Sequence, residues 1–111
     1  MNILQWVLSG LRQQPICVIG FWFQPPRGVH YHQYYTIDMP TTATVDQLLK
    51  TVRELFQVDP TATLDMFYCT SNNAIYRNVL LKDLITTNAL RIGTRNQAAP
   101  AQIPSQVIHL K

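Results

Sequence analysis

Two histidines placed two residues apart, His30 and His32, are the first candidates for chemistry in this chain. If they lie on a strand, their side chains point to the same face and would be able to chelate a metal ion together. A protein zinc site needs at least three protein ligands, and no Cys, Asp or Glu follows the pair at ligand spacing. We therefore interpret the pair as part of a polar strand face, and predict neither a metal nor a cofactor.

The other residue types that carry out catalysis are poorly placed for it. Cys17 and Cys69 both lie inside apolar runs, whereas reactive thiols occupy electropositive, partly open sites. The six acidic residues form no close pair for acid–base work, and no phosphate-binding glycine motif is present. The sequence therefore predicts a protein without catalytic activity. The position of both cysteines inside apolar runs favours a reducing compartment, the cytoplasm or the nucleus.

Composition narrows the classes of protein further. Among the 111 residues, 47% are hydrophobic and 14% are charged, a balance that predicts one folded, soluble domain rather than a disordered chain. The net charge of +3 comes from nine basic residues spread between Arg12 and Lys111. Nucleic-acid binding usually requires a concentrated basic patch, so this spread gives it only weak support. No apolar stretch is long enough to cross a membrane, and the first residues lack the features of a signal peptide.

The N-terminal half predicts two helices and two strands. The apolar spacing in residues 2–13 predicts a short helix, and the unbroken apolar run 16–23 predicts a central strand covered on both faces. A turn at 24–28 joins it to a second strand at 29–39. The main helix begins after Thr44, which forms a T-x-x-Q capping box, and is expected to end at Asp59–Pro60.

The C-terminal half predicts short elements and then a tail. Residues 63–70 and 74–76 read as strands, 80–84 as a single helical turn and 89–94 as the last strand. The following residues are small, polar and rich in proline. We accordingly divide the chain into an N-terminal amphipathic helix (1–14), a core domain (15–95) and a flexible C-terminal tail (96–111).

This order of elements resembles the ubiquitin-like β-grasp superfamily across roughly residues 16–94. The segment IDMPTTATVDQLLKTVREL is similar to the family's strand end, loop and capped helix, and VLLKDL with TTNALRIG is similar to its helical turn and closing strand. The resemblance implies an α+β fold in which a mixed sheet of four to five strands packs on one main helix. It also implies that the last strand lies beside the first.

The same resemblance argues against conjugation to other proteins. Conjugated members end in a glycine at a freed carboxyl terminus, usually in a Gly-Gly pair. This chain contains no Gly-Gly, and its nearest candidate, Gly93, lies within the last expected strand. A modifier that is processed at Gly93 therefore remains a secondary alternative.

Two apolar or aromatic surfaces are candidates for binding. Trp6, Leu8 and Leu11 share the expected N-terminal helix, which either packs on its own domain or docks on a partner or a second copy of the chain; a membrane is not expected, because basic residues do not flank both sides. On the sheet we expect an exposed face around Phe67 and Arg91, with Tyr34 on a tyrosine-rich strand.

The function that we expect is a protein–protein interaction module, an adaptor or assembly subunit that acts by surface recognition. The alternative is a nucleic-acid-associated or viral-type accessory protein with the same fold, because aromatic side chains near basic residues also stack on single-stranded nucleic acid.

Overall fold

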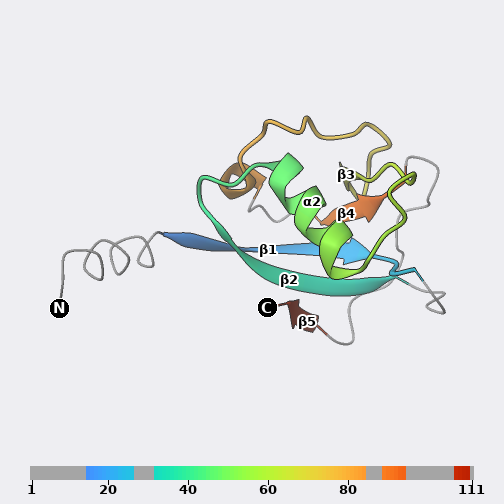
Figure 1. Cartoon of the computed structure of the whole chain (residues 1–111). Coiled ribbons are helices and arrows are strands. Elements are labelled where there is room, and N and C mark those ends of the chain that lie inside the picture. The colour runs from blue at the N-terminus through green and yellow to red at the C-terminus, as the bar shows by residue number, and fades with distance from the viewer. Residues whose placement is uncertain (1–14, 27–31, 85–88, 95–106, 111) are drawn as a thin grey trace.

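A computed structural model shows a mixed five-stranded sheet with one α-helix across it (Figure 1). It describes residues 15–26, 32–84, 89–94 and 107–110. The elements in chain order are β1 (Ile16–Phe23), β2 (Gln33–Pro40), α2 (Val45–Leu55), β3 (Asp65–Tyr68), the 3₁₀ turn η1 (Leu81–Leu84), β4 (Leu90–Gly93) and β5 (Val107–Leu110). No helix among these residues is long and apolar enough to span a bilayer.

The strands are arranged in the order β3-β4-β1-β2-β5. β1 pairs antiparallel with β2 along its whole length, and parallel with β4, which places the expected last strand beside the first. β3 closes one edge antiparallel to β4, and β5 closes the other edge parallel to β2. The prediction of an α+β fold with a mixed sheet and one main helix is therefore confirmed.

The main helix forms where its local signals predict it. Thr44 accepts a hydrogen bond from the Gln47 N–H, and the Gln47 side chain accepts one from the Thr44 N–H, so the capping box is complete. The buried stripe on α2 consists of Val45, Leu48, Leu49 and Val52.

The helix ends four residues before the expected stop at Asp59–Pro60. Gln57 adopts a left-handed backbone with φ of 50°. The N–H of Val58 then bonds to the Arg53 carbonyl at 3.0 Å, and the N–H of Gln57 to the Glu54 carbonyl at 3.3 Å. This is a Schellman end, which satisfies the last carbonyl groups of a helix before any proline is reached.

The hydrophobic core lies between α2 and the sheet face that α2 covers. Every second residue of β1 faces it, and these are Cys17, Ile19, Phe21 and Phe23. β2, β3 and β4 contribute Tyr35, Ile37, Met39, Met66, Leu90 and Ile92. This alternation follows from the two-residue period of a strand, and it leaves the other face of the sheet to a separate set of side chains.

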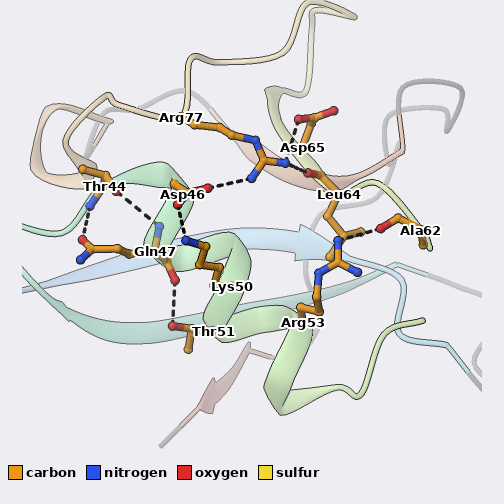
Figure 2. A network of polar contacts seen from close by, with 10 residues as sticks. All are labelled: Thr44, Asp46, Gln47, Lys50, Thr51, Arg53, Ala62, Leu64, Asp65 and Arg77. Atoms are coloured by element: carbon orange, nitrogen blue, oxygen red, sulfur yellow. Dashed lines mark hydrogen bonds and ion pairs between the residues drawn. The ribbon is translucent and has the colours of Figure 1, made fainter. Parts of the chain in front are cut away.

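Two arginines attach the loops around α2 to the helix and to β3 (Figure 2). Arg77 donates to the Asp46 carboxylate at 3.0 Å and to the Leu64 carbonyl at 2.7 Å. Arg53 donates to the carbonyls of Asp59 and Ala62 at 2.8 and 2.7 Å. Hydrogen bonds from Lys50 and Arg77 hold the pKa of the Asp46 carboxyl below its usual value.

Several expected elements differ from the structure. Residues 74–76 do not form a strand; only the Ile75 N–H bonds to the Met66 carbonyl, at 2.7 Å. The predicted helical turn is confirmed as η1. The prediction of a flexible tail is wrong at its end, because Val107–Leu110 pair with β2 as β5. The expected N-terminal helix (2–13), as well as His30, lies outside the described residues.

Candidate protein-binding surface

The sheet face opposite α2, which we call the outer face, carries one residue from every strand in a single line. Parallel and antiparallel pairing place Phe67 opposite Arg91, Arg91 opposite Trp22, Trp22 opposite Tyr34, and Tyr34 opposite Val107. We call these five residues the transverse row. Residues directly opposite one another in a sheet share a face, so the row crosses the whole outer face.

Arg91 is the charged centre of the row, and it is buried. Its side chain is 1% exposed, and the guanidinium carbon lies 4.2 Å from the centre of the Phe67 ring. Nη2 donates to the Ser71 carbonyl at 3.1 Å and to the Asn72 Oδ1 at 3.3 Å. Nε and Nη1 are buried and have no hydrogen-bond partner in the described part of the chain. The side chain therefore retains unused donors inside the protein.

The aromatic part of the row depends on a glycine. Tyr34 packs edge-on against Trp22 with ring centres 5.3 Å apart. The Tyr34 ring reaches over Gly20, where a Cβ atom would overlap the Tyr34 hydroxyl and lie 2.7 Å from its Cζ. The absence of a side chain at Gly20 thus opens the space that Tyr34 fills.

Beyond the row, the outer face opens to solvent at the start of β1. Ile16 and Val18 alternate with the core residues, and they are 59% and 52% exposed. Their partners across β2 are Pro40 and Asp38, which are also exposed. Two aliphatic side chains two positions apart on β1 thus form the exposed apolar part of the described outer face.

β5 attaches to the outer edge of β2 through His109. Its Nδ1 lies 2.8 Å from the Thr36 hydroxyl oxygen, and its Nε2 lies 3.6 Å from an Asp38 carboxylate oxygen. Ile108 and Leu110 lie on the other side of β5 and pack against the core. Sequence reasoning placed no strand after residue 95 and therefore missed β5.

The structure brings together three of the six binding residues predicted from the sequence. Phe67, Arg91 and Tyr34 belong to the transverse row, whereas Trp6, Leu8 and Leu11 lie outside the described residues. The expectation of an exposed surface around Phe67 and Arg91 is wrong, because these side chains are 0% and 1% exposed.

Sequence reasoning also missed Trp22, Ile16 and Val18. The run ICVIGFWF was expected to be covered on both faces. The structure covers both faces only toward the end of β1, where Phe21, Trp22 and Phe23 are all buried. The signal that could have found the exposed pair is the position of Ile16 and Val18 in strict alternation with core residues.

The pKa values of two groups beside the row are shifted by the burial of those groups and by the positive charge of Arg91. Partial burial, and to a lesser extent the positive charge of Arg91, lower the pKa of His32 below its usual 6.5. Burial raises the pKa of the Cys69 thiol, and Arg91 opposes that rise. Cys69 is thus a poor nucleophile at neutral pH. No group of three or more His, Cys, Asp or Glu among the described residues is arranged to hold a metal.

The fold and this face define a small α+β domain with a mixed sheet, one covered face and one partly open face. Comparisons with models of protein families, with curated proteins and with solved structures found no match.

Proposed function

We propose that the chain is a non-catalytic protein-interaction module of the ubiquitin-like β-grasp type, which binds a partner protein through its outer face. The observation that carries the proposal is the exposure of Ile16 and Val18 on that face. They lie on the same face of β1 as Trp22, which belongs to the transverse row. An exposed aliphatic pair on a sheet face that also holds a packed aromatic cluster resembles the apolar centre of a protein interface, where most binding energy is concentrated.

Strand order supports the β-grasp part of the proposal. The parallel pair β1–β4 lies inside the sheet, β2 and β3 flank it, and the capped helix α2 covers one face. These are the features that the sequence resemblance implies. β5 is an addition at the edge of β2, so the proposed fold is an extended member of this class.

The position of Gly93 favours a non-conjugating member over a modifier. Gly93 is buried and is the last residue of β4, in register with Asp65 of β3. A protease that cleaved after Gly93 would need to peel this strand from the sheet, because proteases bind their substrates as extended, accessible backbone.

Charge on the described surface favours a protein over a nucleic acid. Lys50 and Arg77 are paired with Asp46, and Arg53 bonds to two carbonyl groups, all on the α2 side. On the outer face the described basic groups are Arg91, which is buried, and two histidines. A phosphate backbone is bound through several accessible cations at once, an arrangement that the described residues of this face do not offer.

The proposal can be tested by photo-crosslinking in cells that make the protein. A photoreactive phenylalanine analogue replaces Val18 in one variant and Leu55, the 44% exposed apolar residue at the end of α2, in a matched control. We expect discrete protein adducts from position 18 that are absent from position 55.

A second substitution, Ile16→Asp, should abolish those adducts while circular dichroism remains unchanged, because Ile16 lies at the exposed end of β1. Equal labelling at both positions, or no adduct at position 18, would refute binding through the outer face. Adducts that contain nucleic acid, and that disappear in high salt, would support the accessory-protein alternative instead.

A further inference from the structure

Arg91 is a buried cation for which the chain supplies no acidic side chain. The sequence contains six acidic residues: Asp38, Asp46, Glu54, Asp59, Asp65 and Asp83. All six belong to the described part of the chain, and none of the ion pairs found there includes Arg91.

The direction of β5 follows from its register. Val107 lies opposite Tyr34 in the transverse row, and Leu110 lies opposite Ile37, three positions further along β2. At roughly 3.3 Å per residue, Leu110 is about 10 Å beyond the row. It is also separated from β4 by β1 and β2. The described residues of β5 therefore lead away from Arg91.

The contacts that Arg91 does make leave its charge uncompensated. Phe67 covers the flat face of the guanidinium at 4.2 Å, a cation–π contact that involves no negative charge. The N–H bonds lie in the plane of the group, and only those of Nη2 reach described acceptors, a carbonyl and a side-chain amide. Buried charges in proteins are normally paired, because removing a lone ion from water is expensive.

We propose that Arg91 is an anion-binding residue, and that its ligand is a carboxylate presented by a partner protein at the outer face, beside Trp22 and His32. One guanidinium matches one carboxylate in charge and in hydrogen-bonding geometry. A nucleic acid would require further cations, which the described outer face lacks. The inference rests on the proposed function for the source of the carboxylate, but binding of a carboxylate to Arg91 can be measured without any partner.

The neighbourhood suits a carboxylate that is removed from water. Trp22 is 6% exposed and Phe67 is fully buried, so an anion that reaches Arg91 exchanges water for an apolar surrounding. Charge-assisted hydrogen bonds are stronger in such surroundings. Because Nε and Nη1 are themselves buried, the ligand must displace the atoms that cover them, and a small free carboxylate should bind weakly.

The test uses the full chain and sodium acetate as the probe. The ¹⁵N-labelled protein is titrated with acetate at constant ionic strength, balanced with chloride, and the Arg91 Nε–H signal is followed by NMR. We expect a saturable shift of that signal and of the Trp22 indole N–H, while the Arg53 Nε–H signal, which belongs to a residue on the α2 side, does not move. No saturable shift at Arg91 would overturn the proposal, as would sulfate binding in the absence of acetate binding, which would indicate a site for phosphate-like anions.

Thermal unfolding provides the second arm. At an acetate concentration ten times the dissociation constant, mass action shifts the wild-type folding equilibrium by about 11-fold, or roughly 5 °C in Tm. The Arg91→Met variant should not show this acetate-dependent rise in Tm. Lys82→Met, which removes the same charge from an exposed position on η1, should keep it. An equal rise in Tm with acetate in both variants would refute a role for Arg91. If Arg91→Met does not fold, the NMR titration alone decides the question.

The two proposals fail separately. Acetate binding without any partner adduct at position 18 would leave the anion site standing and overturn the proposed function. Partner adducts at position 18 without acetate binding would leave the interaction module standing and overturn the carboxylate site.

Discussion

Replacing Gly20 with alanine distinguishes the effect of local strand propensity from the effect of tertiary packing, because the two predict changes in stability of opposite sign. Glycine inside a strand is destabilising by roughly 0.5–1 kcal/mol relative to alanine, owing to the extra freedom it loses on folding. Local reasoning therefore predicts that Gly20→Ala stabilises the protein. The structure places the Tyr34 hydroxyl in the space of the new methyl group, with Cζ only 2.7 Å away.

The tertiary effect is the larger of the two. Overpacking a close contact by one methyl group is destabilising by about 1–3 kcal/mol. Part of this is the edge-on contact with Trp22, since aromatic pairs contribute about 0.5–1.5 kcal/mol. After the local gain of about 0.5–1 kcal/mol is subtracted, we expect Gly20→Ala to lower the free energy of unfolding by up to about 2.5 kcal/mol, with a central value of about 1 kcal/mol.

The assay is urea unfolding of a double-mutant cycle. Gly20→Ala is measured in the wild type and in a Tyr34→Ala background, where the methyl group meets no ring and should stabilise. The coupling energy between the two positions should be about 1–3 kcal/mol. Tyr34→Phe is the matched intermediate, because it removes the closest atom and keeps Cζ.

Two results would refute the reasoning about this face. A Gly20→Ala variant more stable than the wild type would mean that Tyr34 does not occupy the space over Gly20. A coupling energy below about 0.5 kcal/mol, within the range of independent sites, would lead to the same conclusion.

Three further predictions concern the row and the main helix. Arg91→Met should raise the pKa of His32, because the positive charge that helps to lower it is removed; an NMR titration that shows no change would contradict this. The folded chain binds fewer protons at His32 than the unfolded chain below pH 6.5, so stability falls as the pH drops through that value, and the variant should lose less stability than the wild type. Thr44→Ala should lower the free energy of unfolding by about 1 kcal/mol through loss of the helix cap, whereas Thr42→Ala, at an exposed position before the helix, should change it by less than about 0.5 kcal/mol. Gln57→Gly should raise stability by about 1 kcal/mol because glycine adopts positive φ without strain, and Gln57→Ala should not.

Local signals were sufficient to predict most of the elements around the sheet. The capping residues Thr44 and Gln47 are close in sequence, and both of their hydrogen bonds form within one helical turn. The helix end was predicted too late because no local pattern marks Gln57, a non-glycine residue in left-handed conformation. Residues 74–76 have side chains that favour a strand, but in the structure they do not make the backbone pairing that a strand requires.

The candidate site was predicted only in part, for a different reason. Phe67, Arg91 and Tyr34 could be selected by residue type and by the expected face of each strand. Whether each one is exposed depends on neighbours from distant parts of the chain, and the structure buries Phe67 and Arg91. The attachment of β5 also depends on tertiary pairing, since Val107–Leu110 have no strand partner near them in sequence.

Local signals thus sufficed for the fold class and the capped helix, because each rests on hydrogen bonds or periodicity within a few residues. The register that aligns Phe67, Arg91, Trp22 and Tyr34 across four strands, and the exposure of Ile16 and Val18, depend on tertiary packing. The strands that meet in this row are up to about 70 residues apart in sequence. Their alignment is set by packing and backbone pairing across the whole sheet, which no local pattern encodes.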